Sequence, residues 1–220
     1  MTGFTRSPQL VKGGLVVLDA ATGAVKRTIA LQYNPDTLTR SYQVQGVGGE
    51  GGGERAQPFR LIGPAIESIK LEAEIDATDA LEQPDQHANA VAFGIAPQLA
   101  ALEGLVNPGS AELQRLGAQS RQGTLEVLLP EAPLTLFIWS ASRVVPVRVT
   151  DFSITEEAFD AALNPIRAKV SLGLRVLTTD DLGFEHRGGA MFINHLRTRE
   201  ALAGKTGSAS LQSLGVSALP

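Results

Sequence analysis

The sequence contains no cysteine, and this absence removes several classes of chemistry. Without cysteine the chain forms no disulfide, offers no thiolate nucleophile and binds no zinc through sulfur. Folding therefore requires no oxidising compartment, which fits a reducing environment without proving it. Aromatic residues are also few, at 5% of the chain, so we expect a core built mainly from leucine, valine, isoleucine and alanine.

The chain also lacks an excess of charge of one sign and a long apolar run. Nineteen basic residues stand against 23 acidic ones, and the net charge of −4 argues against nucleic acid as a partner. No stretch approaches the roughly 18 apolar residues of a membrane span, so no membrane insertion is expected. Residues 1–10 lack the apolar segment of a secretory signal. With 220 residues, 43% of them hydrophobic, the composition is typical of a soluble protein with one main domain.

Much of the sequence alternates between apolar and polar residues, as antiparallel strands do. Residues 13–33 predict a hairpin with its turn at residues 19–23, and a third strand is expected to run through Tyr42 and Val44. Residues 66–75 alternate strictly, which predicts a half-buried strand. Further strands are expected at residues 124–129, 134–140, 144–154 and 167–177.

Other segments follow different patterns. Between residues 85 and 106 apolar residues recur every three or four positions, which predicts a helix that Pro97 either kinks or starts. Shorter helices are expected at residues 111–116 and 190–203. Six glycines lie within residues 46–57, which predicts a flexible loop.

Antiparallel strands interrupted by one helix predict a mainly β fold with some α structure. We expect an antiparallel β-barrel or sandwich with one flanking helix at about residues 85–106 and a short C-terminal helix. This domain is expected to span residues 1–180. Residues 181–220 are expected to form a C-terminal extension that contains the short helix and ends in a weakly specified tail at residues 208–220.

The sequence offers little sign of catalytic chemistry. His186 and His195 are nine residues apart, which fits no metal-ligand spacing, so these two and His87 are interpreted as surface or interface residues. The acidic pairs at residues 156–157 and 180–181 are interpreted as turn or helix-cap residues. The glycine-rich loop lacks the spacing of a phosphate loop and carries glutamates. No catalytic, cofactor-binding or metal-binding residue is predicted, no cofactor is expected, and the chain is not expected to be an enzyme.

Two other kinds of function remain as alternatives. Binding of carbohydrate or cell wall would be favoured by an exposed aromatic platform, but the single tryptophan, Trp139, lies in an apolar strand where core packing is favoured. A hydrolase would need acid and base groups that converge in a pocket.

Two segments resemble a known family of structural proteins. Residues 31–42, LQYNPDTLTRSY, are similar to the opening of the tube-protein family of contractile injection systems, which carries an aromatic-Asn-Pro-Glu/Asp-x-Leu stretch. Residues 151–170 resemble that family's paired strands, joined by a segment that ends in Leu-Asn-Pro-x-Arg-Ala. The likeness covers about residues 13–200. It is strongest to the tube-type domain of the tube-spike adaptor, without the LysM module that follows in many relatives.

This resemblance implies both a fold and a role. It implies a tube-type β-barrel that assembles as a homo-hexameric ring in the baseplate of a phage tail-like particle and connects the inner tube to the spike. The implied partners are further copies of the chain, inner tube subunits, the spike or hub protein and other baseplate proteins. Assembly is expected in the cytoplasm, with release of the particle from the cell left open. A carbohydrate- or cell-wall-binding baseplate accessory protein is the alternative.

Overall fold

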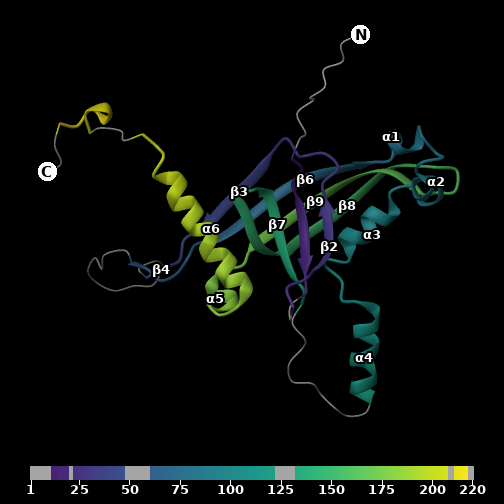
Figure 1. The fold of residues 1–220 in the computed structure, drawn as a ribbon, viewed down its shortest axis with the longest axis horizontal. Coiled ribbons are helices and arrows are strands. Elements are labelled where there is room, and N and C mark those ends of the chain that lie inside the picture. Colours follow the sequence, from purple (N-terminus) through teal and green to yellow (C-terminus); the bar gives the residue numbers. More distant parts are fainter. Residues whose placement is uncertain (1–10, 20–21, 48–59, 122–131, 208–210, 218–220) are drawn as a thin grey trace, which may run out of the picture.

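The computed structural model of the chain describes residues 11–19, 22–47, 60–121, 132–207 and 211–217, and Figure 1 shows their arrangement. The strands are β1 (Gly14–Leu18), β2 (Val25–Ala30), β3 (Leu38–Gln43), β4 (Gly46–Val47), β5 (Arg60–Leu61), β6 (Ile66–Asp76), β7 (Leu134–Ser140), β8 (Arg143–Phe159) and β9 (Pro165–Val176). The helices are α1 (Thr78–Leu81), α2 (Ala88–Phe93), α3 (Ala96–Glu103), α4 (Ser110–Arg121), α5 (Thr179–Leu182), α6 (Arg187–Ala203) and the 3-10 turn η1 (Leu211–Leu214).

Seven strands form one antiparallel sheet in the order β2-β1-β7-β8-β9-β6-β3, and β4 pairs only with β5. The prediction of a mainly β fold with α structure is confirmed. The prediction of a barrel is wrong in one respect, because the sheet is not closed: β2 and β3 lie at its two ends and do not pair with each other.

The open sheet nevertheless curls around a single main core. In Figure 1 the strands β1, β2 and β7 cross β6, β8 and β9 steeply. Buried side chains of Leu15 on β1, Phe137 on β7, Ile69 on β6 and Leu174 on β9 belong to one apolar cluster. The sheet therefore has two halves that face each other, and β8 belongs to both, because residues 143–147 pair with β7 and residues 147–159 pair with β9.

The gap between the two ends of the sheet, called the seam below, has a local cause. The chain leaves β2 at Ala30 and soon reaches Pro35, whose nitrogen carries no hydrogen for a strand ladder. A side chain takes the place of backbone pairing: the Gln32 amide nitrogen donates to Asp76 O at 2.7 Å, and Asp76 N donates to Gln32 Oε1 at 2.9 Å. The Gln32 amide thus joins the segment after β2 to the last residue of β6.

Two helices complete the core from different sides. The predicted helix over residues 85–106 is instead two helices, because Gly94, with a φ of 57°, ends α2, and α3 begins with Pro97 in its first turn. Leu99 and Leu102 of α3 are buried in the main core. Phe192 of α6 is buried there too, whereas the neighbouring Met191 packs on a second, smaller cluster with Leu18 and Leu134.

Most of the other predicted segments are present with modest shifts. The hairpin of β1 and β2, the strand β3 and the strands β6 to β9 are confirmed, and residues 111–116 are part of the longer helix α4. Residues 190–203 lie within α6. The strand expected at residues 124–129 and most of the glycine-rich loop lie outside the described residues, but the start of that loop is a strand, since Gly46 pairs with Leu61.

Candidate assembly surface

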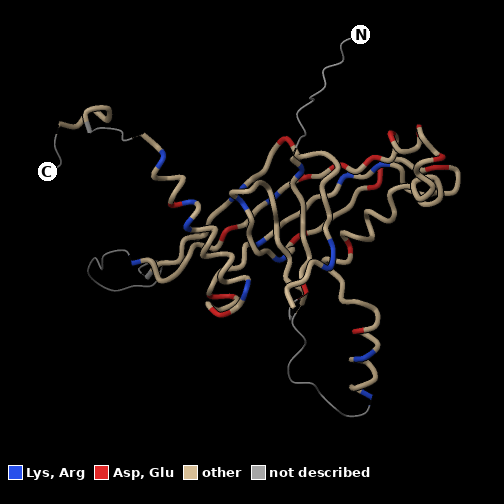
Figure 2. Tube along the Cα trace, in the orientation of Figure 1, with Lys and Arg blue, Asp and Glu red and all other residues tan. Residues whose placement is uncertain are grey.

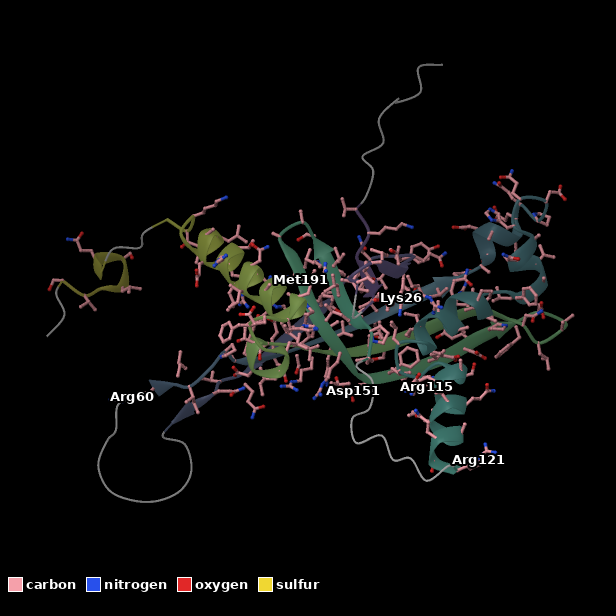
Figure 3. All side chains as sticks on the ribbon, turned by 60° about the horizontal axis from the view of Figure 1, so that its bottom comes forward. Lys26, Arg60, Arg115, Arg121, Asp151 and Met191 are labelled. Atoms are coloured by element: carbon pink, nitrogen blue, oxygen red, sulfur yellow. The ribbon has the colours of Figure 1, made fainter. Side chains whose placement is uncertain are left out.

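Four neighbouring strands, β8, β9, β6 and β3, form a half-sheet with one apolar and one polar face. Residues that are directly opposite each other in the ladder share a face, so the register assigns every side chain. Between its two ends, the face turned away from the core contains only polar residues and one glycine: Thr39, Ser41, Ser68, Lys70, Glu72, Glu74, Arg148, Asp151, Ser153, Thr155, Lys169, Ser171, Gly173 and Arg175. Apolar side chains lie on this face at its ends only, Ile66 at one end and Ala158 and Phe159 at the other. A wide sheet face whose central part has no apolar side chain is built to stay in contact with water. Asp151, on this polar face, is labelled in Figure 3.

Both side edges of this half-sheet are free among the described residues. Strand β3 pairs with β6 on one side and has no described partner on the other. Strand β8 pairs with β7 only as far as Val147, so residues 148–159 have no described partner on that side. The free edges present unpaired backbone N–H and C=O groups, which can pair with strands of another chain.

The turn between β8 and β9 projects as a tip and holds an unusual residue. Leu163 has a φ of 66°, in the left-handed region that costs a non-glycine residue roughly 1–2 kcal/mol. Its side chain is 78% exposed. Asp160 holds the turn: its Oδ1 accepts from Asn164 N at 2.8 Å, and its Oδ2 accepts from the Asn164 side-chain amide at 2.8 Å. These hydrogen bonds keep the pKa of Asp160 below its usual value.

Helix α2 packs beside this tip and widens its apolar surface. Asn164 Nδ2 donates to Ala92 O at 3.3 Å, and Ile95 N donates to Pro165 O at 2.8 Å. Phe93 is 53% exposed, and Val91 and Phe159 are exposed as well. Exposed apolar side chains gathered at one end of a molecule are typical of a protein contact surface.

The two motifs of the resemblance act here as structural clamps. In the first, Asn34 Oδ1 accepts from Gly13 N at 2.9 Å and its Nδ2 donates to Val11 O at 2.9 Å, which fixes the chain as it enters β1. In the second, Asn164 closes the β8–β9 turn. Each asparagine therefore shapes the backbone next to a proline, and neither lies in a reactive cluster with the histidines.

The structure separates the three histidines. His87 is exposed, and His186 caps α6 by accepting from Gly188 N at 3.0 Å. The interpretation as a surface residue is wrong for His195, which is only 5% exposed on the buried side of α6 and has no hydrogen-bond partner for Nδ1 among the described residues. Burial lowers its pKa, although Glu67 acts in the opposite direction. No group of potential metal ligands is found among the described residues.

The acidic pairs and the tryptophan have structural positions. Asp181 forms a capping box with Thr178 at the start of α5, as the cap interpretation predicted. The pair at residues 156–157 lies inside β8 instead of a turn, and Glu157 forms an ion pair with Lys169 at 3.0 Å. Trp139 is half-buried and stacks on Phe137 with 5.9 Å between ring centroids, so it packs against the core.

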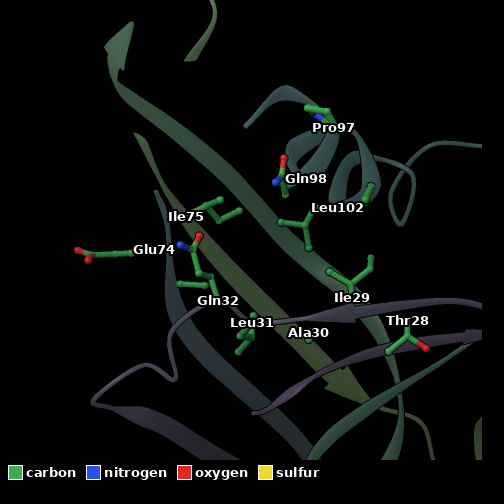
Figure 4. A pocket seen from close by; sticks show the side chains of 12 residues that line it. Thr28, Ile29, Ala30, Leu31, Gln32, Glu74, Ile75, Pro97, Gln98 and Leu102 are labelled. Carbon is green, nitrogen blue, oxygen red and sulfur yellow. The ribbon is translucent and has the colours of Figure 1, made fainter. Parts of the chain in front are cut away.

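Two hollows flank the seam. One, of about 300 Å³, lies between β2, β6 and α3 and is lined mainly by apolar side chains, including those of Ile29, Leu31, Ile75 and Leu102 (Figure 4). The other, of about 440 Å³, is polar and lies between residues 33–37 and the outward side chains of Glu72, Glu74 and Lys169. Neither hollow contains a histidine, and no set of nucleophile, base and oxyanion donors converges in them.

Within the described parts of the chain, no helix is both long and apolar enough to cross a membrane.

Comparison with known proteins gives loose structural likenesses, among them chains of gene transfer agent particles. No family model matches the sequence, and no curated protein matches it. A chain from the tail of an empty gene transfer agent particle with C6 symmetry is 15% identical, with 74% of this chain and 90% of that chain covered and a TM-score of 0.29. A chain from the virion of a native gene transfer agent particle is 13% identical, with the same coverages and a TM-score of 0.28. TM-scores this low do not establish a shared fold.

Proposed function

We propose that this chain is a non-enzymatic structural subunit of a phage tail-like contractile injection system, and that it forms a homo-hexameric ring in the baseplate between the inner tube and the spike. Its partners would be further copies, inner tube subunits, the spike or hub protein and other baseplate proteins. Two lines of support exist. The segments 31–42 and 151–170 resemble the tube-protein family, and the half-sheet has two free edges on opposite sides.

The free edges carry the proposal, because their directions are complementary. Strands β8, β9, β6 and β3 alternate in direction, so β3 runs antiparallel to β8. If β3 of one copy lies beside residues 148–159 of the next, the antiparallel pattern continues without interruption. Such a contact joins two different surfaces and is therefore heterologous, and heterologous contacts close into rings when the rotation permits.

The two faces of the half-sheet fit a ring with a channel. The apolar face is already covered by the chain's own core, while the polar face meets other described segments only at its margins, where residues 33–37 lie beside Glu74 and Asp181 pairs with Arg175. In a closed ring the polar faces of all copies would line a water-filled channel. Every position in such a lining must tolerate water, which matches the polar side chains along the central part of that face.

The natural lack of cysteine allows a direct test of the edge contact. A protein with Ser41→Cys on β3 and Ser153→Cys on β8 carries one thiol at each free edge, both on the polar face. Mild oxidation at high protein concentration should give a ladder of covalent oligomers in denaturing electrophoresis. Thr155→Cys and Arg148→Cys, each combined with Ser41→Cys, sample other registers along β8.

Matched controls separate edge pairing from random collision. A single-cysteine protein can form covalent dimers only, whichever edge carries the thiol. A pair placed in the middle of the half-sheet and not opposite each other, Ser68→Cys with Ser171→Cys, should give no ladder. Negative-stain images of the oxidised edge pair should show rings. Random dimers from every variant, with no ladder from any edge pair, would overturn the proposed ring.

A further inference from the structure

An unbalanced cluster of charges lies at one end of the half-sheet, where β6 begins, β3 ends and α6 packs. Glu67, only 4% exposed, accepts from Arg40 Nε at 2.6 Å, and Arg199 approaches it at 3.4 Å. The guanidinium groups of Arg40 and Arg199 lie 5.2 and 5.3 Å from the ring centre of Tyr42. Arg40 also donates to the Tyr42 hydroxyl. One buried carboxylate is thus shared by two arginines on an aromatic support.

A third arginine makes the imbalance larger. Arg143 starts β8 and is half-buried, and it has no hydrogen bond or ion pair to another described residue. Burial lowers its pKa, and the nearby positive charges of Arg40 and Arg199 lower it further, against the opposite effect of Glu67. Three cations thus surround one anion. Partly buried cations without a counter-ion are costly, so the cluster is expected to attract another carboxylate or a comparable oxyanion.

The opposite end of the half-sheet has the complementary charge. Residues 77–95, which include α1 and α2, contain three carboxylates and no lysine or arginine. These carboxylates, of Asp79, Glu82 and Asp85, are exposed. Figure 2 shows acidic positions at this end of the molecule, and basic positions gather near β3 and α6. The 11 residues of β6 separate the two ends by about 35 Å, so one chain cannot bring them together.

We propose that the Arg40, Arg143 and Arg199 cluster is a socket for the acidic end of another copy, so that copies stack head to tail along the strand direction. This inference rests on the proposed function, because the two ends of the half-sheet become the two faces of a ring, and it adds that more than one ring of this chain would lie between the inner tube and the spike. The socket is partly buried and supplies guanidinium groups, which bind carboxylates through paired N–H donors. Glu82 and Asp85 have no ion pair to a described residue and can serve as the entering groups.

Charge reversal at each end gives a test by mixing. Arg143→Glu should weaken self-association at least about tenfold in analytical ultracentrifugation, because two arginines then face two carboxylates and the socket loses the net positive charge that attracts the acidic end. The double variant Glu82→Lys with Asp85→Lys should weaken it similarly. An equimolar mixture of the two proteins should associate again, because the added carboxylate of one protein then meets the added lysines of the other and each native end meets a native one.

Three further measurements keep the test decisive. Arg121→Glu on α4, far from the socket, makes the same change of charge and should leave association unchanged; Arg121 is labelled in Figure 3. Arg143→Gln removes the charge with less disturbance of Glu67 and should weaken association while thermal unfolding shows an intact fold. The cysteine ladder between β3 and β8 should survive in Arg143→Glu, which distinguishes failure of stacking from failure of the ring.

One outcome of the mixing experiment would overturn the proposed contact between the socket and the acidic end. If the mixture of charge-reversed proteins associates no better than its components, the two ends do not meet. If phosphate then raises the melting temperature of the native protein but not that of Arg143→Glu, the cluster is a site for a free oxyanion.

Discussion

At the scale of single residues, the leucine at the tip of the β8–β9 turn has an unfavourable backbone conformation that the fold does not explain. Leu163 occupies the left-handed region and turns its side chain into solvent, although glycine or asparagine would fit that backbone better. The adjacent Asp160 and Asn164 already hold the turn through hydrogen bonds. An exposed apolar side chain kept at a strained position indicates a contact outside the chain.

We expect Leu163→Gly to separate folding from assembly. Relief of the left-handed strain offsets the greater flexibility of glycine in the unfolded chain, so the free energy of unfolding should stay within about 1 kcal/mol of its present value. Assembly into rings or stacks should weaken, because the most exposed apolar group of the tip is lost. Urea unfolding and sedimentation of the same samples measure the two quantities.

Leu163→Asn is the matched control for this position. It keeps a side chain and tolerates the left-handed region, but it removes the apolar surface. It should fold as well as Leu163→Gly and assemble equally poorly. A clear loss of unfolding free energy in both variants, with assembly unchanged, would mean that Leu163 serves the fold.

At the scale of elements, the helices divide into those that fill the core and those that do not. Helix α3 buries Leu99 and Leu102 against both halves of the sheet, at the place where the open edges would otherwise admit water. Helix α4 has no buried residue, although it is longer and also carries leucines. Helix length is therefore a poor guide to the contribution of a helix to stability.

A pair of leucine-to-alanine changes tests this division. Leu102→Ala should lower the free energy of unfolding by about 2–5 kcal/mol, because it leaves a cavity beside Ile29 and Ile75. Leu113→Ala, on the exposed side of α4, should change it by no more than about 0.5 kcal/mol. Thermal or denaturant unfolding of both variants gives the comparison. Equal losses would show that α4 is packed more firmly than its exposed leucines indicate.

The elements also show what the sequence can predict. Strict alternation predicted β6 and β9 closely, since the buried residues Ile69, Leu71 and Val170 follow the period of two. The helical period over residues 85–106 was correct only for its centre, because Ile95, Leu99 and Leu102 are buried while Val91 and Val106 are exposed. Periodicity reports which side chains could share a face, but Gly94 and the approach of β9 decide where the helix breaks.

The candidate surface was harder to predict from the sequence than the strands were. A free edge depends on which strands fail to pair, and the Gln32 side chain that joins the segment after β2 to β6 has no recognisable pattern. The socket combines β3, β6, β8 and α6, so Arg40 and Arg199 are far apart in sequence. One feature of the sequence could have indicated the socket. Glu67 lies in β6 at a position that the alternation of the strand assigns to the buried, apolar face.

At the scale of the whole molecule, the proposed ring changes the surroundings of particular backbone amides. In the separate chain, alternate amides of β3 and of residues 148–159 point to free edges and should exchange hydrogen quickly. Assembly through these edges should slow their exchange. Amides of β9, which has a neighbouring strand on each side, should be protected in both states.

Hydrogen exchange of the dilute and the assembled protein checks this expectation without any substitution. Slower exchange at β3 and β8 together would support edge pairing between copies. Slower exchange at the tip and α6 alone would indicate stacking without a continuous sheet, and the ring would then need another lateral contact.

The long ladder between β8 and β9 also sets how the molecule would respond to a mechanical load. A push on the tip is directed along both strands, so it loads their hydrogen bonds in shear, and all rungs must yield together. A pull on β2, whose single partner strand is the short β1, could open its rungs one after another like a zipper. The chain is thus stiff along the strand direction and soft at one edge. A part that transmits axial compression while its side edges bind neighbours would need this combination.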